Sequence, residues 1–262
     1  MAGIIIAVLL GWAGGYRFYK KQAKMGILYL FTGGLCGIGW IIDVVKAISE
    51  YTKTAPAPTV RKAPANLPPY FNVGQDRYMT PRAEFTPNYV NQKHYIVYDF
   101  ETTGVDPHEC EIIEIGALKI ADGQIVDRFQ SLVKPFYPIP ADATQVNHIT
   151  NAMVENAPSA SEVLPRFLDF IEDSKLVGYN IVKFDHIILR RYAAGICGRS
   201  LSNYITDVFL LSRKSFDLPK YTLSDVANYL GVNVSNAHRS IGDCETTWEC
   251  LKKLQEIYKE GR

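Results

Sequence analysis

The sequence has little cysteine: five residues in 262, with no Cys-x-x-Cys pair and no even-numbered set. That pattern argues against a disulfide framework and is typical of reduced cysteines in a cytosolic domain. Charge is absent from residues 2–15 and from residues 25–42. Acidic residues are scarce early in the chain: residues 1–92 hold ten Lys and Arg against four Asp and Glu, whereas residues 93–262 hold eighteen against twenty-three. The basic part therefore suits a membrane surface or a nucleic-acid backbone, and the acidic part suits a metal-dependent site.

The two uncharged stretches predict a membrane hairpin. As a helix, residues 25–42 would span roughly 27 Å, close to the thickness of the hydrocarbon core. Residues 2–15 are shorter and would need their aromatic flank or a thinner bilayer to span it. A signal peptide is the alternative, but it requires a positive charge before the apolar run, and only Met-Ala-Gly precedes Ile4.

This hairpin resembles the two-transmembrane "TM-two" domain family over about residues 3–46. The matching segments are residues 11–19, with an Arg-Phe-Tyr turn, residues 26–28, residues 33–34, and residues 39–43, with a terminal Trp-x-x-Asp. Tyr16 stands where the family often has His. The resemblance implies a multi-pass membrane protein with two spans, whose residues 3–46 contact the lipid bilayer.

Basic residues follow each of the two predicted spans, and the two groups predict opposite orientations in the membrane. Those between the spans favour a cytoplasmic loop under the positive-inside rule, which would export the rest of the chain. Those after the second span favour a cytoplasmic catalytic domain, which also agrees with the reduced cysteines, and we expect that orientation. The first group is Arg17, Lys20, Lys21 and Lys24, and the second is Lys46, Lys53, Arg61 and Lys62.

Three domains follow from this pattern: a hairpin over residues 1–48, a linker over residues 49–92 and a catalytic domain over residues 93–262. Seven of the fourteen prolines lie in the linker, without apolar periodicity. Such a segment is extended and semi-rigid. Its basic residues could bind anionic lipid or nucleic acid, but a plain spacer is the favoured interpretation.

A buried strand opens the third domain and ends in two carboxylates. Residues 95–98 are rich in β-branched and aromatic side chains, and Asp99 and Glu101 follow two apart. Strand side chains alternate with period two, so both carboxylates leave the same face. Neighbouring like charges repel, and a pair of Mg²⁺ ions would relieve that repulsion. A solvated strand end is the alternative for this pair taken alone.

The remaining pattern predicts an α/β domain with a mixed sheet, in which a meander of strands precedes alternating strands and helices. Further strands are expected over residues 112–120, 124–133, 175–179 and 204–208, and helices over residues 159–171, 185–194, 222–230 and 241–258.

Three later residues join the acidic pair as candidates. Asp185 and Asp243 each open a predicted helix, where a carboxylate is favourable and where a simple capping role is the alternative. His238 lies five residues before Asp243 in an expected loop, close enough to share one site with it.

The set Asp99-x-Glu101, Asp185 and His238-x-x-x-x-Asp243 resembles the DEDDh 3′–5′ exonucleases, the family of the epsilon proofreading subunit of bacterial DNA polymerase III. The resemblance covers about residues 93–259 and extends to the segments around these residues. Those segments are residues 99–104, 112–117, 138–140, 149–150, 157–158 and 184–185.

The resemblance implies a ribonuclease-H-like α/β fold and a metal-dependent 3′–5′ exonuclease. Asp99, Glu101, Asp185 and Asp243 would hold two Mg²⁺ or Mn²⁺ ions through oxygen ligands. His238 would act as general base, since imidazole exchanges protons near neutral pH. The product would be a nucleoside 5′-monophosphate released from a nucleic-acid 3′ end.

The resemblance also implies where substrate binds. The backbone at Thr102 and Thr103 would meet the terminal sugar, and His148 and Ile149 would lie near the terminal base. His148 departs from the Gly common in the family, and Tyr179 departs from the common His. Basic side chains could contact phosphates: Lys183, Arg190, Arg191, Arg213, Lys214, Lys220 and Arg239.

Three alternatives stay open at this point. DNA is the favoured substrate, but the metal site does not distinguish it from RNA, so an exoribonuclease is the first alternative. A membrane-tethered nucleic-acid-binding scaffold with a silent nuclease fold is the second, although it would not need the five catalytic residues. A proofreading subunit tied to a polymerase is the third, and a polymerase or another membrane protein is the possible partner.

Overall fold

The computed structural model describes residues 68–71, 91, 93–234 and 238–260, all within one compact unit, Ala65–Arg262. The predicted hairpin, residues 1–48, and most of the predicted linker lie outside the described residues. Among the helices that are described, none is both long enough and apolar enough to cross a bilayer.

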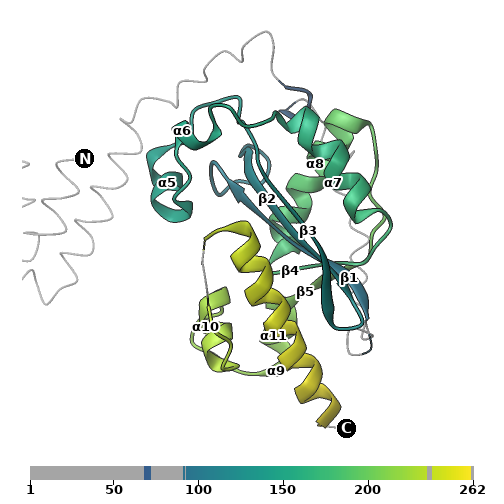
Figure 1. Cartoon of the computed structure of the whole chain (residues 1–262). Coiled ribbons are helices and arrows are strands. Elements are labelled where there is room, and N and C mark those ends of the chain that lie inside the picture. The colour runs from purple at the N-terminus through teal and green to yellow at the C-terminus, as the bar shows by residue number, and fades with distance from the viewer. Residues whose placement is uncertain (1–67, 72–90, 92, 235–237, 261–262) are drawn as a thin grey trace, which may run out of the picture. The chain divides into compact units, whose positions relative to one another are not determined.

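A five-stranded mixed sheet forms the centre of this unit (Figure 1). The strand order is β3-β2-β1-β4-β5; β1, β2 and β3 are antiparallel neighbours, and β4 and β5 run parallel to β1. The predicted meander and mixed α/β sheet are thereby confirmed. The strands are β1 (His94–Thr102), β2 (Ile112–Ala121), β3 (Gln124–Leu132), β4 (Leu176–Gly178) and β5 (Ile205–Asp207).

Helices cover both faces of the sheet (Figure 1). α7 and α8 bury one face through a cluster that includes Phe167 and Leu189. α9, α10 and α11 bury the other through a cluster that includes Val208, Val226 and Leu251. The helices are α5 (Ala141–Asn147), α6 (Asn151–Val154), α7 (Ala160–Ile171), α8 (Asp185–Cys197), α9 (Val208–Ser215), α10 (Leu223–Tyr229) and α11 (Ser240–Glu260).

Alternation along β1 decides which face carries the acidic pair. Ile96, Tyr98 and Phe100 point into the cluster under α7 and α8. Tyr95 and Val97 point the other way, into the cluster under α11. Because side chains repeat every two residues, Asp99 and Glu101 share the α11 face. The strand thus buries both faces and still presents two carboxylates to one helix.

The sequence does not predict α5 and α6, which span seven and four residues. Helices this short are marginal by themselves and form where tertiary contacts hold them. The hydroxyl of Thr150 caps α6 by accepting from Met153 N, and Asn147 ends α5 as a buried residue. These contacts become visible only once the chain is folded.

A short 3₁₀ helix, η2 (Pro69–Phe71), lies within the predicted linker and contacts α8. Its Tyr70 is buried and belongs to the same core cluster as Phe167 and Leu189. The predicted linker is therefore more than a spacer at this point.

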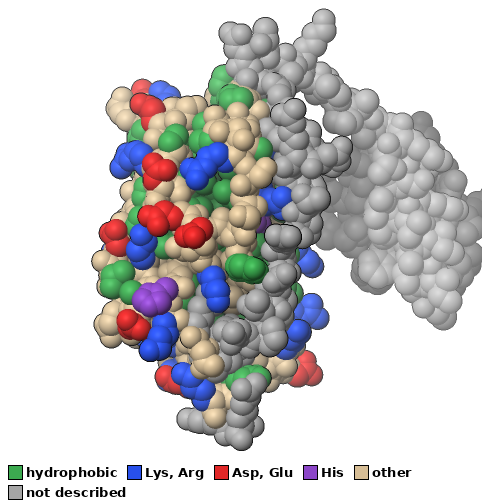
Figure 2. All heavy atoms as spheres, turned by 90° about the vertical axis from the view of Figure 1, so that its right-hand side faces the viewer, with side chains coloured by type: hydrophobic (Ala, Val, Ile, Leu, Met, Phe, Trp, Pro, Cys, Tyr) green, Lys and Arg blue, Asp and Glu red, His purple; other side chains and the backbone are tan. Residues whose placement is uncertain are grey.

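The side of the unit that carries α7 and α8 has a mixed surface. Figure 2 shows acidic and basic side chains interspersed there, with hydrophobic side chains in small separate groups. All four cysteines in the described residues are free thiols. A surface of alternating sign offers little attraction to a long nucleic-acid backbone.

Candidate active site

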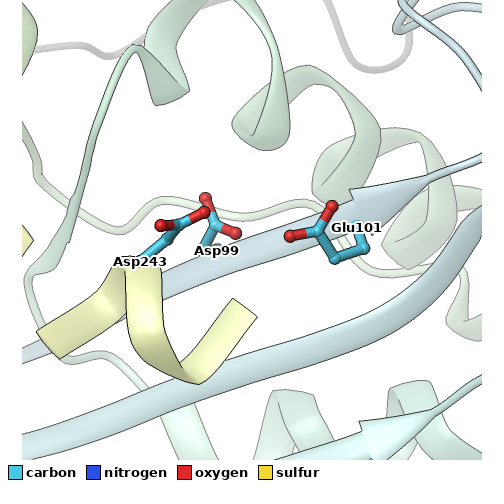
Figure 3. Close-up of side chains that lie close together, drawn as sticks. All are labelled: Asp99, Glu101 and Asp243. Atoms are coloured by element: carbon cyan, nitrogen blue, oxygen red, sulfur yellow. The ribbon is translucent and has the colours of Figure 1, made fainter. Parts of the chain in front are cut away.

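Three of the predicted carboxylates meet at the end of β1. Asp99 and Glu101 leave the same face of the strand, and Asp243 lies in the first turn of α11. Each side chain offers one oxygen, and these oxygens all lie within 4.8 Å of one another. Figure 3 shows the carboxylates of Asp99 and Asp243 close together, with that of Glu101 further along the strand. Residues 142 positions apart in the sequence thus form one cluster.

The cluster is electrostatically unfavourable by itself. Burial, followed by the nearby charges of Asp185 and Glu101, raises the pKa of Asp99 well above its usual range. Burial and then Asp243 and Glu114 raise the pKa of Glu101 from 4.5 to about 8. A nearby cation would stabilise the ionised form of carboxyl groups with such raised pKa values.

The donor set fits divalent metal ions. Partly buried carboxylate oxygens are hard ligands of the kind that Mg²⁺ and Mn²⁺ take. A bound cation would also favour the ionised carboxylates and so offset the repulsion described above.

Asp185 lies beside this cluster but outside the group that shares the 4.8 Å limit. It opens α8, is buried, and its Oδ1 accepts a hydrogen bond of 3.1 Å from Phe100 N, the amide between the two acidic residues of β1. Burial raises its pKa to about 7, against the lowering effect of its own amide and that of Phe100. The helix start and the strand are therefore linked directly at the site.

His238 lies next to Asp243 through its main chain. Its N–H donates to Asp243 Oδ2 at 3.2 Å, and its side chain is exposed. The residue has φ 62°, a left-handed conformation uncommon outside glycine. Burial raises the pKa of Asp243, while the imidazole and amide of His238 lower it. The structure therefore brings His238 to the edge of the cluster, and its role as base stays a prediction.

The predicted sugar-binding residues begin a loop that returns to β2. Thr103 N–H donates to the Glu111 carbonyl and Glu111 N–H donates to Thr103 Oγ1, both at 2.9 Å. Thr102 Oγ1 donates to the Gly104 carbonyl at 2.8 Å. These bonds close residues 103–111 into a loop, named here the 103–111 loop, directly after the acidic pair.

The predicted base-binding residues differ from each other in exposure. Asn147 Nδ2 donates to the Thr102 carbonyl at 3.3 Å, which brings the end of α5 to the end of β1. His148 is the C-cap residue directly after α5 and has a left-handed conformation, φ 60°, with an exposed side chain. Ile149 is fully buried and packs with Ile113. Of the pair, only His148 presents its side chain at the surface.

Sequence reasoning missed two residues of β2 that place the start of α11. Glu114 is buried and accepts from Ser240 N at 3.1 Å and from Arg239 Nη2 at 2.6 Å. Burial would raise its pKa, but the bonds from Arg239 and Ser240 outweigh that effect and lower it. An acidic residue inside an apolar strand is itself a signal, because a buried charge requires a partner.

Gly116 gives α11 room to approach the sheet. A Cβ at this position would lie 2.6 Å from the backbone carbon of Ser240, a distance that side chains do not tolerate. Together Glu114 and Gly116 fix the first turn of α11, and with it Asp243.

Five of the seven predicted phosphate-binding cations separate into two groups; of the other two, Lys183 is exposed and Arg190 is buried. Arg191 donates to the carbonyls of His108 and Cys110, and Arg239 pairs with Glu114, so both have structural partners. Others line a hollow of about 890 Å³ that is formed by α9 and the segment connecting it to α10, named here the hollow between α9 and α10. Its charged residues are Arg213, Lys214, Lys220 and Asp217.

Aromatic rings connect that hollow to the sheet edge of the site. The Arg213 guanidinium lies over the rings of Phe209 and Tyr221, 5.8 and 5.6 Å from their centres. Tyr179, the residue after β4, donates its hydroxyl to the Tyr221 carbonyl at 2.7 Å. Since β4 is parallel to β1, with Val177 opposite Val97, Tyr179 lies at the same sheet edge as Asp99.

Comparisons with known proteins match two families and several DNA polymerase III proteins. Residues 96–251 match the Exonuclease family, and residues 1–45 match the TM2 domain. A DNA polymerase III PolC-type protein of Thermotoga maritima is 39% identical over 166 residues, 63% of this chain and 12% of that protein. The DNA polymerase III subunit epsilon of Aquifex aeolicus is 34% identical over 166 residues, 63% of this chain and 82% of the subunit.

Solved structures share the fold. E. coli Exonuclease I in complex with a dT13 oligonucleotide has a TM-score of 0.55 at 18% identity, over 65% of this chain and 42% of that one. Exonuclease X in complex with 5′ overhanging duplex DNA has a TM-score of 0.50 at 24% identity, over 64% and 93%.

A mixed sheet with helices on both faces, matched along its length by the Exonuclease family model, is the fold of an exonuclease domain. The chain belongs to the Exonuclease family, and its domain is related to the DNA polymerase III epsilon and PolC-type proteins. The prediction of a nuclease enzyme domain is confirmed at this level.

Proposed function

We propose that the chain is a membrane-anchored, divalent-metal-dependent 3′–5′ exonuclease of the DEDDh type. It would hydrolyse nucleic acid from the 3′ end to nucleoside 5′-monophosphates. The observation that carries the proposal is the approach of Asp99, Glu101 and Asp243 within 4.8 Å, with Asp185 bonded to the amide between the first two.

The proposal divides the work between metal-binding, proton-accepting and substrate-binding residues. Asp99, Glu101, Asp185 and Asp243 would hold two Mg²⁺ or Mn²⁺ ions, which when bound supply Lewis acidity for water attack and for departure of the 3′-oxygen. His238 would accept the proton of the attacking water from its exposed position beside Asp243. The backbone at Thr102 and Thr103 would meet the terminal sugar, and His148 and Ile149 would lie near the terminal base.

DNA is the favoured substrate. The related proteins are DNA polymerase III components, and both structural neighbours named above are bound to DNA. An exoribonuclease remains the alternative, because four carboxylates do not distinguish the two sugars. A polymerase partner is also consistent with these relatives.

The hollow between α9 and α10 suits the strand that trails behind the 3′ end. A guanidinium held over two rings is oriented to bind phosphate, and aromatic rings nearby allow bases to stack. The hydrogen bond from the Tyr179 hydroxyl to the Tyr221 carbonyl joins this hollow to the end of the sheet that carries Asp99.

The membrane part of the proposal rests on the match to the TM2 domain at residues 1–45. Residues 3–46 would form two spans within a hairpin of residues 1–48. A linker, residues 49–92, would carry the nuclease domain, residues 93–262, on the cytoplasmic side.

The test is release of 5′-mononucleotides by the purified chain in detergent. Matched single-stranded DNA and RNA would be supplied with Mg²⁺, Mn²⁺ or EDTA. We expect metal-dependent trimming from the 3′ end that Asp99→Asn abolishes and that the exposed Asp127→Asn leaves intact. Faster trimming of RNA would favour the exoribonuclease. No trimming by a folded chain that still binds oligonucleotide would favour the silent scaffold instead.

A further inference from the structure

Two aromatic residues of the predicted linker dock onto the nuclease domain. The Tyr70 ring is 4% exposed and stacks on Tyr192 of α8, with centres 4.1 Å apart and planes 13° from parallel. Its hydroxyl donates to Glu111 Oε2 at 2.9 Å. Phe71 lies beside it, with the Arg191 guanidinium 5.7 Å from its ring centre. Tyr70 and Phe71 are named here the aromatic anchor.

The aromatic anchor lies outside the Exonuclease match. That match begins at residue 96, which is 26 positions after Tyr70. A plain spacer would leave its aromatic rings in water. Burial of a whole tyrosine ring with a satisfied hydroxyl is instead the behaviour of a core residue. In Figure 1 this segment is the short coloured stretch above α8.

Glu111, which accepts the hydrogen bond from Tyr70, also bonds to two other segments of the domain. Its carboxylate also accepts from Phe136 N at 2.7 Å and from Tyr137 N at 2.9 Å, and it is buried. Its main chain makes both bonds to Thr103 that close the 103–111 loop. One residue therefore joins the anchor to the loop that follows the acidic pair.

Arg191 makes a second connection between the anchor and the loop. Its guanidinium donates to the carbonyls of His108 and Cys110, both in the 103–111 loop. Tyr192, on which Tyr70 stacks, accepts from Ile112 N at 3.1 Å, where β2 begins. Loss of the anchor would uncover the partners that hold both sides of this loop.

We propose that the aromatic anchor is a positioning element: docked, it holds the 103–111 loop, and hence Thr103, in place to receive the substrate 3′ end. This rests on the proposed function, since it assigns Thr103 to substrate. The linker between the membrane hairpin and the nuclease domain would therefore contribute to substrate binding. Removing the aromatic anchor from its place on the domain would weaken that binding.

The first test is independent of catalysis. Hydrogen exchange of the full chain would be followed in peptides that contain Thr103 and Glu111, for wild type, Tyr70→Phe, Tyr70→Ala and the control Leu254→Ala. Leu254 is a buried core residue of α11 in the opposite cluster. We expect loop exchange to rise about tenfold in Tyr70→Ala, less in Tyr70→Phe, and to stay at the wild-type rate in Leu254→Ala.

The second test separates positioning from general destabilisation. With a single-stranded oligonucleotide and saturating Mg²⁺, we expect KM to rise about tenfold in Tyr70→Ala, with kcat within about twofold of wild type. Tyr70→Phe should recover most of the loss because it keeps the stacked ring. Leu254→Ala, which loses a comparable buried side chain, should keep the wild-type KM.

Two results would overturn the proposal. One is unchanged loop exchange in Tyr70→Ala, which would show that the anchor does not hold the loop whether or not the chain is a nuclease. The other is a KM that rises equally in Leu254→Ala, which would reduce the anchor to general packing. If the wild type is inactive but loop exchange still rises in Tyr70→Ala and not in Leu254→Ala, the proposed function is refuted and the structural role of the anchor is kept.

Discussion

Without divalent cations, the acidic cluster should destabilise the folded protein as the pH rises. Glu101 has its pKa raised from 4.5 to about 8, so near pH 6 it is protonated in the folded chain and ionised in the unfolded chain. The folded state then binds more protons than the unfolded state, and raising the pH lowers the free energy of unfolding. For one carboxyl with these values the loss between pH 5 and pH 8 is about 3–4 kcal/mol.

The assay is urea unfolding of the purified chain in EDTA from pH 5 to pH 8, followed by circular dichroism. We expect the wild type to lose stability over this range and Glu101→Gln to be more stable than the wild type at pH 8 by about 2–4 kcal/mol. Mg²⁺ or Mn²⁺ should flatten the pH dependence of the wild type, because bound cations favour ionised carboxylates. The exposed Asp127→Asn should follow the wild type.

A free energy of unfolding that is level between pH 5 and pH 8 in EDTA would refute this reasoning. So would a Glu101→Gln variant that is no more stable than the wild type at pH 8. Either result would mean that the carboxylates are not forced together in the folded chain, and the metal-site interpretation would lose its physical basis.

Three further predictions concern the elements around the cluster. Arg239→Ala leaves Glu114 buried without its cation and should lower the free energy of unfolding by about 2–4 kcal/mol, whereas Arg128→Ala, at an exposed ion pair, should cost less than about 1 kcal/mol in the same melts. Gly116→Ala should displace the start of α11, cost about 1–3 kcal/mol and lower kcat. Arg213→Gln should raise KM for long oligonucleotides about fivefold and lessen its salt dependence, without changing hydrolysis of the p-nitrophenyl ester of thymidine 5′-monophosphate.

Matched variants decide each of these outcomes. Gly104→Ala meets only Cys110 Cβ at 3.8 Å and should fold normally; equal damage from both glycine changes would contradict the close approach of α11. Arg199→Gln, on the α7 and α8 side, should leave oligonucleotide KM unchanged. If Arg213→Gln also leaves it unchanged, the hollow between α9 and α10 is not the path of the strand.

The order of strands and helices could be predicted because it depends on local periodicity. Alternation in β1 and the spacing of Val163, Phe167 and Ile171 in α7 are properties of neighbouring residues. The helices α5 and α6 are too short to carry such a pattern, and the docking of Tyr70 depends on Glu111, 41 positions later. A contact between residues so far apart in the sequence produces no hydrophobic periodicity in the Pro-rich linker, so sequence patterns do not reveal it.

By itself the sequence determined the chemistry of the site: which residues carry carboxylates, that Asp99 and Glu101 share a face, and that Asp243 opens a helix. Only the tertiary structure decided their distances. The cluster closes because Glu114 binds the start of α11 and Gly116 leaves space for it, and because Phe100 N bonds Asp185. The tertiary structure also joined Tyr70 to the loop beside the site. The sequence specifies the type of each side chain, whereas the partners of that side chain depend on which distant segments pack together.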